Sequence, residues 1–320
     1  MRIVMMGTGS FAEPTFARLL DSAHTVVGLV TQPDRAVFKE TASSRQPRNT
    51  MKELAVSRNI PVLQPQSINT PDGVSALQTL SPELLVVAAY GQILSKEVLS
   101  IAPEGGINVH ASLLPKYRGA APINWAIYHG ETQSGVTIIR MSIALDAGDM
   151  LAQEAIDILP TETTGELESR LGPLGAKLAI DIVDRLALGP VIGTPQDKSL
   201  ATKAPKLTKE HGQIDWSRPA VDVCNHIRAM QPWPTAYTYL VRSELEAMRL
   251  IVNVATAISA PIPLGGCGDI HAIGDRLIVQ CGRDTQVEIA ELQPAGKRRM
   301  SSHDFLRGNT IPPGARMAAG

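Results

Sequence analysis

The chain has 320 residues, a formal net charge of −1 and 44% hydrophobic residues. A chain of this length usually divides into two domains, and its apolar content is sufficient for ordinary cores, which excludes a disordered protein. A net charge near zero gives no general nucleic-acid signature, and the apolar stretches are far shorter than the roughly 20 residues that cross a bilayer. We therefore expect a globular, cytoplasmic protein that does not enter a membrane.

The cysteines give no indication of a metal centre. Cys224, Cys267 and Cys281 are few, odd in number and widely spaced, and they form no C-x-x-C pair with histidines at ligand spacing. The sequence therefore predicts reduced thiols and no metal.

The first half of the chain alternates predicted strands with predicted helices. It opens with a buried strand over residues 2–6, a turn at Gly7–Ser10 and a helix over residues 11–20. Further predicted strands span residues 25–31, 61–63, 84–89, 106–110, 136–141 and 150–156, and further helices span residues 50–58 and 165–188. This alternation predicts an α/β domain over residues 1–189 with a Rossmann-like parallel sheet, in which 136–141 and 150–156 form a pair and the helix 165–188 closes the domain.

The second half has a different pattern. Glycines and prolines interrupt the alternation, so residues 190–206 are predicted to be a linker and residues 207–320 a second domain. After a predicted helix over residues 220–230, short strands are expected at 236–241, 248–255, 270–272, 277–281 and 286–292. Several short strands separated by turns favour a small β-barrel of the oligonucleotide-binding type.

The densest group of reactive side chains follows the predicted strand 106–110. In an extended backbone, residues i and i+2 point to the same side, so Asn108 and His110 present an amide and an imidazole at the carboxyl end of the sheet. These groups suit an acyl transfer, because its tetrahedral centre needs donors for an oxyanion and its amine must lose a proton. Taken singly, His110 is more typical of a hydrogen-bonded core residue and Asn108 of a turn cap, so the combination has to decide.

A carboxylate is expected to join this pair from a loop further along the chain. Asp146 lies in the loop between the two paired strands, where it could face His110 and favour its protonated form. Asp149 competes for the same role on pattern alone, and either aspartate could instead form an ordinary turn.

The run from Asn108 to Gly119, Asn-x-His-x-Ser-Leu-Leu-Pro-x-x-Arg-Gly, together with the later Leu145-Asp146-x-Gly148-Asp149, resembles a known family over nearly the whole chain. It is similar to the methionyl-tRNA formyltransferases, within the wider family of enzymes that use 10-formyltetrahydrofolate. The resemblance implies that Asn108, His110 and Asp146 are catalytic. It also implies a folate-binding set, which comprises Ser112, Leu113, Leu114, Pro115, Tyr90, Ile93 and Leu94. For the segment around Tyr90, plain core packing is the alternative.

The resemblance further implies a partner, the initiator methionyl-tRNA, and a role in the initiation of translation. The basic residues expected to contact tRNA phosphates are Arg35, Lys39, Arg45, Arg48, Lys206, Lys209, Lys297, Arg298 and Arg299. The loop after Asp34 lacks the glycines that the resemblance leads one to expect, so a merely solvated loop is the alternative there. Trp216 and Trp233 are interpreted as packing residues, and a monomer is expected.

Other functions compete with this interpretation. A related enzyme could formylate a UDP-amino-sugar instead of tRNA, since both share the catalytic residues. The pattern Gly7-x-Gly9-x-x-Ala12 after a strand, with Asp34 further on, is also typical of a nicotinamide-dependent oxidoreductase. A tRNA-binding module without catalysis is the third possibility, and the Asn108, His110 and Asp146 set argues against it.

Overall fold

The computed structural model describes residues 1–34, 50–242, 245–258 and 265–318. The chain forms two compact units. Unit 1 comprises Met1–Pro122, Gln133–Asp157 and Glu168–Pro205, and unit 2 comprises Ile123–Thr132, Ile158–Leu167 and Lys206–Gly320. Within the described ranges, no helix is both long and apolar enough to cross a membrane.

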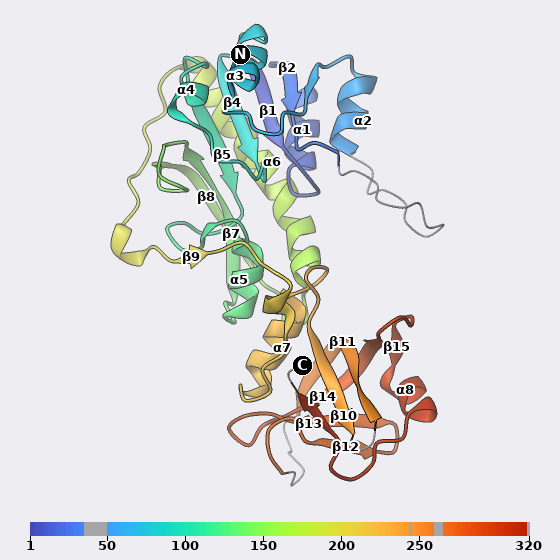
Figure 1. Ribbon diagram of the computed structural model, residues 1–320. Coiled ribbons are helices and arrows are strands. Elements are labelled where there is room, and N and C mark those ends of the chain that lie inside the picture. Colours follow the sequence, from blue (N-terminus) through green and yellow to red (C-terminus); the bar gives the residue numbers. More distant parts are fainter. Residues whose placement is uncertain (35–49, 243–244, 259–264, 319–320) are drawn as a thin grey trace. The chain divides into compact units, whose positions relative to one another are not determined.

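Unit 1 is built on a seven-stranded sheet in the order β3-β2-β1-β4-β5-β7-β8 (Figure 1). Its strands are β1 (Arg2–Gly7), β2 (Thr25–Val30), β3 (Val62–Leu63), β4 (Leu84–Ala88), β5 (Gly106–His110), β7 (Gln133–Arg140) and β8 (Met150–Asp157). The pairs from β3 to β5 are parallel, whereas β7 pairs antiparallel with both β5 and β8. The predicted parallel sheet is therefore confirmed from β3 to β5, and the antiparallel direction of β7 is a feature that the sequence pattern did not predict.

Helices cover both faces of this sheet because side chains along each strand alternate between them. The helices are α1 (Glu13–Leu20), α2 (Thr50–Ser57), α3 (Pro71–Thr79), α4 (Lys96–Leu99) and α6 (Thr164–Leu188). On one face, Val4 and Val87 pack with Leu77 of α3 and Val98 of α4 in a buried cluster. On the other face, α6 approaches so closely that a Cβ on Gly175 would lie 2.7 Å from Cγ1 of Val109 in β5. The helix α6 therefore packs directly against β5.

Three short helices were not expected from the sequence: α3, α4 and α5 (Pro122–Tyr128). The helices α4 and α5 contain only four and seven residues, too few for a clear period, and α3 begins with Pro71, Asp72 and Gly73, which favour a turn. Even so, α3 and α4 carry cap signals. Thr70 accepts a hydrogen bond from Gly73 N at 3.2 Å and precedes a proline, and Ser95 accepts one from Val98 N at 3.2 Å. Side-chain caps of this kind typically contribute about 1 kcal/mol and mark a helix start.

Unit 2 contains an antiparallel sheet that curls into a half-barrel, in the order β12-β13-β14-β11-β10-β16. Its strands are β10 (Tyr237–Arg242), β11 (Leu245–Ile258), β12 (Ile270–Ile273), β13 (Arg276–Gln280), β14 (Gln286–Pro294), β15 (Met300–Ser301), which pairs with β14, and β16 (Arg316–Ala318). Near its edges, the backbones of Asp269 and Arg316 form an isolated antiparallel β-bridge, and Met317 N donates to Gly268 O at 2.7 Å. The helices α7 (Ala220–Ala229) and α8 (Ser302–Gly308) belong to the same unit.

The five strands predicted for the second half correspond to β10–β14, and the curled antiparallel architecture is confirmed. The additional strands β15 and β16 contain two and three residues, too few to produce an alternating pattern. Trp216 is buried and donates from its indole nitrogen to Thr238 at 2.9 Å, as expected of a packing residue. Trp233, in contrast, is 51% exposed.

A histidine buried in α7 makes unit 2 sensitive to acid. His226 donates from Nε2 to the carbonyl oxygen of His211 at 2.8 Å. Burial lowers the pKa of His226 to about 4, against the smaller raising effect of that hydrogen bond, and the nearby Arg218 lowers the pKa further. The folded chain therefore keeps His226 neutral where an ordinary histidine is charged.

We expect the free energy of unfolding of unit 2 to decrease as the pH falls from about 6.5 towards 4. In this window His226 binds a proton in the unfolded chain but not in the folded chain. The contribution of neutral His226 to the free energy of unfolding, present above pH 6.5, is therefore lost. At about 1.4 kcal/mol per pKa unit, the loss approaches about 3 kcal/mol. Trp125, Trp216 and Trp233 all lie in unit 2, so urea unfolding followed by tryptophan fluorescence reports on it. The variant His226→Gln should flatten the pH dependence; an unchanged slope would exclude His226 as its source.

Candidate functional site

The candidate site begins at the carboxyl end of β5. Val109 faces α6, so the alternation of the strand turns Asn108 and His110 to the opposite side. His110 is buried and Asn108 is partly buried. The strand is hydrogen-bonded between β4 and β7, which fixes the position of both side chains.

Asp146 meets both of these residues. The Asn108 amide nitrogen donates to Oδ1 of Asp146 at 3.3 Å, and Nδ1 of His110 lies 3.7 Å from Oδ2. Oδ2 also accepts a hydrogen bond from the backbone of Gly119 at 2.8 Å. Asp149 is exposed. Of the two aspartates that the pattern left open, Asp146 is therefore the one that faces His110.

The His110 ring is oriented by a second contact. Its Nε2 lies 2.9 Å from the carbonyl oxygen of Tyr117, which can only accept, so this nitrogen carries a hydrogen. Its Nδ1 faces a carboxylate. At 3.7 Å, Nδ1 lies beyond hydrogen-bonding distance of this carboxylate, so Asp146 orients the ring while Nδ1 can take part in proton transfer.

The loop after β5 is held by its own hydrogen bonds. Ser112 donates from its hydroxyl to Lys116 O at 2.8 Å, and Thr137 of β7 donates to Ser112 O at 2.7 Å and accepts from Leu114 N at 3.1 Å. Of the four residues expected to bind folate here, Ser112 and Leu114 are buried, while Leu113 and Pro115 remain partly exposed. The first two therefore shape the loop, and the last two can present a surface.

The segment after β4 divides in the same way. Tyr90 and Leu94 lie in the buried cluster between the sheet, α3 and α4, whereas Ile93 is 67% exposed. Burial raises the pKa of Tyr90 to about 12, and its hydroxyl has no hydrogen-bond partner within the described part of the chain. Tyr90 and Leu94 therefore have the surroundings of core residues, as the alternative interpretation of this segment predicts.

Two residues that sequence reasoning did not single out brace the loop of Asp146. The side-chain nitrogen of Gln196 donates to the backbone carbonyls of Asp146 at 2.9 Å and Gly148 at 2.7 Å. The Gln196 side-chain oxygen accepts two hydrogen bonds from the Arg118 guanidinium, at 3.1 and 2.7 Å. Arg118 belongs to the Asn108–Gly119 run, which could have drawn attention to it; Gln196, 50 residues beyond Asp146, carries no such signal.

The same segment reaches the loop after β5. β9 (Lys203–Ala204) pairs in parallel with β6 (Arg118–Gly119), and the Thr202 hydroxyl accepts from Tyr117 N at 2.8 Å. A Cβ on Gly119 would lie 2.4 Å from Ala204 O, so this contact requires glycine. Residues 194–204 thus contact both loops that carry the candidate site.

The basic residues expected to bind tRNA do not form one cluster among the described residues. Arg35, Lys39, Arg45 and Arg48 lie outside the described ranges. Lys206 and Lys209 are exposed at the start of the main segment of unit 2, and Lys297, Arg298 and Arg299 are exposed on the turn between β14 and β15. Arg299 pairs with Glu291.

The glycine pattern near the amino terminus has a packing explanation. A Cβ on Gly7 would lie 2.8 Å from both Ala12 Cβ and Ala88 O, so glycine is needed where α1 approaches β1 and β4. Asp34 is paired with Lys52 at 2.5 Å and accepts from Gln64 at 3.0 Å. In the described part of the chain, no group of three His, Cys, Asp or Glu side chains is placed to hold a metal ion.

Comparisons with known proteins agree with this architecture. The model of the family "Formyl transferase" matches residues 1–183, and the model "Formyl transferase, C-terminal domain" matches residues 206–310. The chain is 44% identical over 314 residues to the methionyl-tRNA formyltransferase of Citrifermentans bemidjiense, covering 98% of this chain and 95% of the relative. It is 41% identical over 317 residues to that of Bacillus licheniformis, with 99% and 98% covered.

A solved structure shares the fold. The sugar 3N-formyl transferase WlaRD, crystallised with dTDP and 5-N-formyl-THF, superposes with a TM-score of 0.66 at 15% identity, covering 93% of this chain and 99% of that one. The two family models and this fold define the class of the protein as a formyl transferase. Within that class, the chain belongs to the family of methionyl-tRNA formyltransferases. The relatives give no support to the oxidoreductase alternative.

Proposed function

We propose that the chain transfers the formyl group of 10-formyltetrahydrofolate to the α-amine of initiator methionyl-tRNA. The observation that carries the proposal is the meeting of an amide, an imidazole and a carboxylate at the end of β5, in a member of the methionyl-tRNA formyltransferases. The formyl-folate in the WlaRD crystals supports a folate donor. We propose the cytoplasm as the place of action and a monomer as the active form.

In the proposed mechanism, the uncharged amine attacks the formyl carbon directly. The new N–C bond forms a tetrahedral centre, whose oxyanion accepts from Asn108, because only one of the two amide hydrogens is used by Asp146. Nδ1 of His110 accepts the proton that the amine loses, and the positive charge that the ring then carries beside Asp146 stabilises the same oxyanion. The bond from the formyl carbon to the folate nitrogen then breaks.

Proton balance assigns a second role to His110. The attacking amine loses one proton and the leaving folate nitrogen gains one, so the site has only to pass a proton across the tetrahedral centre. His110 is the ring placed to do this: Nδ1 accepts the amine proton and returns it to the leaving nitrogen, while Nε2 stays hydrogen-bonded to Tyr117 O and Asp146 orients the ring. Ser112, Leu113, Leu114, Pro115 and Ile93 would line the donor site, with Tyr90 and Leu94 supporting it from the core.

One assay tests the reaction and its acceptor. Purified protein is given formyl-labelled 10-formyltetrahydrofolate together with charged methionyl-tRNA, a UDP-amino-sugar or glycinamide ribonucleotide. We expect label on methionyl-tRNA alone. Label on the amino sugar instead would support the second acceptor, and no transfer to any amine would reject the proposed reaction.

We expect Gln196→Ala to lower kcat about 10- to 100-fold, because a misplacement of about 1 Å in a catalytic group can cost roughly 100-fold. The substitution removes both donors to the Asp146 loop, whereas KM for the folate donor should change little. Gln196→Glu keeps an acceptor for Arg118 but cannot donate to the carbonyls, so it should not restore kcat. Gln78→Ala, on the exposed side of α3, is the matched control; an equal effect in both would contradict a positioning role.

A further inference from the structure

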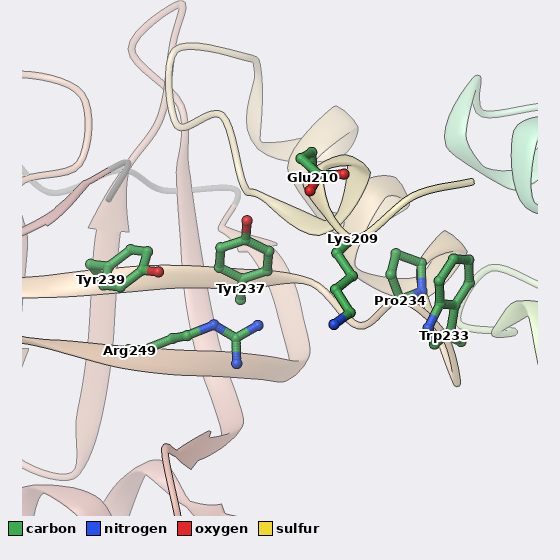
Figure 2. Close-up of a pocket in the computed structure, with 7 residues that line it drawn as sticks. All are labelled: Lys209, Glu210, Trp233, Pro234, Tyr237, Tyr239 and Arg249. Atoms are coloured by element: carbon green, nitrogen blue, oxygen red, sulfur yellow. The ribbon is translucent and has the colours of Figure 1, made fainter. Parts of the chain in front are cut away.

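A hollow of about 520 Å³ in unit 2, lined in part by Lys209, involves none of the residues that the proposed mechanism uses (Figure 2). Because Lys209 is already expected to contact tRNA, this hollow leads back to the acceptor that the proposed function names. Unit 1 contains a contact without an assigned role. The side chain of Gln153, on β8, reaches the loop Ser112–Pro115 that is proposed to line the donor site.

Gln153 and His110 lie in one row of residues across the sheet. In the strand register, His110 of β5 is the partner of Thr137 of β7, and Thr137 is in turn the partner of Gln153 of β8. Side chains of directly paired residues project from the same face of a sheet. Gln153 therefore lies on the face that carries His110, two strands away from it.

The amide nitrogen of Gln153 is hydrogen-bonded to two oxygen atoms. It donates to Leu114 O at 2.9 Å and to the Thr137 hydroxyl at 2.8 Å. Thr137 donates its only hydroxyl hydrogen to Ser112 O at 2.7 Å, so its oxygen can only accept from Gln153. An amide nitrogen carries two hydrogens, and the loop and the threonine that supports it therefore use both.

Leu114 is consequently held at both of its backbone polar groups. Its nitrogen donates to the Thr137 hydroxyl at 3.1 Å, and its oxygen accepts from Gln153. Leu114 is buried, whereas Leu113 and Pro115 on either side of it are partly exposed. The two side-chain contacts at Leu114 therefore determine where its neighbours present their surface.

The loop also lies directly against β7. A Cβ on Gly135 would lie 2.5 Å from Cδ2 of Leu113. Gly135 precedes Thr137 by two residues, so both lie on the same face of the strand. Glycine at position 135 makes room for the Leu113 side chain, and Thr137 then holds the next residue of the loop. The loop thus depends on the sheet for its position at two successive residues.

We propose that Gln153 is a positioning residue for the formyl donor: together with Thr137 it keeps the loop Ser112–Pro115 in the conformation that binds the folate. The inference rests on the proposed function, which assigns this loop to the donor site. Without the Gln153 amide, Leu114 O loses its hydrogen-bond donor and the loop populates other conformations. Only a fraction of the chains can then bind the donor at any time, and the apparent affinity falls by that fraction.

The test compares Gln153→Met with the unaltered full-length chain. Methionine keeps the length of the side chain but has no hydrogen to donate. KM for the folate donor should rise roughly tenfold, as expected if about one chain in ten holds the loop in place. In contrast, kcat should change less than about twofold, because the bound donor selects the correct loop conformation. Gln196→Ala is expected to show the opposite pattern, so the split between KM and kcat distinguishes the roles of the two glutamines.

The matched control is Gln133→Met, in the same pair of strands. Gln133 also donates from its side-chain nitrogen, but to the exposed Asp157, at 3.0 Å. The same chemical change is thus made away from the loop. Both KM and kcat should stay within about twofold of the unaltered chain, since an exposed contact of this kind contributes little.

A double-mutant cycle tests whether Gln153 and Thr137 act together. Thr137→Val should also raise KM for the donor, because it removes the other contact at Leu114. The double variant should raise KM less than the product of the two single effects, since both side chains hold the same residue. A double variant equal to that product would contradict the joint role.

Direct binding separates this inference from the proposed function. Isothermal titration calorimetry with 5-formyltetrahydrofolate, the formyl-folate of the WlaRD crystals, should give a Kd about tenfold higher for Gln153→Met and unchanged for Gln133→Met. Urea unfolding should show that both variants are folded.

The outcomes distinguish the two claims. If the chain formylates methionyl-tRNA but Gln153→Met binds 5-formyltetrahydrofolate as tightly as the unaltered chain, the inference is overturned and the proposed function stands. If the chain formylates another amine and Gln153→Met still loses affinity, the inference stands and the proposed acceptor is wrong. If the unaltered chain does not bind 5-formyltetrahydrofolate, both the inference and the proposed donor are rejected.

Discussion

We expect His110→Ala to lower the rate of formyl transfer about 10²- to 10⁴-fold, the range that a positioned acid–base and charge-stabilising group usually contributes. Tyr117 O and Asp146 orient the ring. In the proposed mechanism the ring passes the proton and carries the charge beside the oxyanion, and the substitution removes both. Asp146→Asn should have an effect of similar order, because a neutral amide does not stabilise the ring once it has taken up the proton. Single-turnover measurements with bound donor isolate this chemical step.

The chain offers a matched control for this pair. His303 and Asp275 are exposed, and Nε2 of His303 lies 3.7 Å from the carboxylate, the same separation as between His110 and Asp146. His303→Ala and Asp275→Asn should leave the rate within about twofold, since a solvent-exposed pair contributes little. Circular dichroism should show that all four variants are folded. Near-normal turnover by folded His110→Ala would contradict the proposed mechanism.

The second large effect is expected at Gly148. A Cβ at this position would lie 1.7 Å from the backbone oxygen of Arg140. Hydrogen bonds hold the backbone at both Gly148 and Arg140 in place. Arg140 N donates to Asp149 O at 2.9 Å, and Gln196 donates to Gly148 O at 2.7 Å. In Gly148→Ala the loop must therefore move away from β7, and Asp146 moves with it.

We expect Gly148→Ala to lower kcat at least tenfold and the free energy of unfolding by about 1–3 kcal/mol, as for other overpacked sites. Activity and urea unfolding measured on the same preparation check both effects. The control is Gly266→Ala, because a Cβ there meets nothing within 4 Å. Loss of stability with unchanged kcat would show that Asp146 does not depend on this loop geometry.

The sequence predicts the fold well wherever apolar residues repeat over a whole strand or a long helix. β5 was predicted with its observed bounds, and α6 within one residue, because buried runs and long amphipathic periods are strong signals. The helix α5 and the strands β15 and β16 are too short for a period to develop, and α3 begins with Pro71, Asp72 and Gly73, which resemble a turn. Their positions depend on caps and on neighbouring strands, which pattern alone does not reveal.

The candidate site was predictable in part. The spacing of Asn108 and His110 on one strand places them on one side, but only the folded loop distinguishes Asp146 from Asp149. Burial separates residues that the sequence grouped together, such as Ile93 from Tyr90. Gln196 could not be predicted, since its contacts join segments 50 residues apart and leave no local pattern.

The segment after α6 has one further consequence. By composition, residues 190–206 resemble a tether whose length and sequence could vary freely. In the structure, Gln196, Thr202 and Ala204 lie against the two loops that carry the candidate site. A deletion within this stretch should consequently slow turnover before it has any other effect. The geometry of the reaction centre is completed only when this late part of the chain has been added.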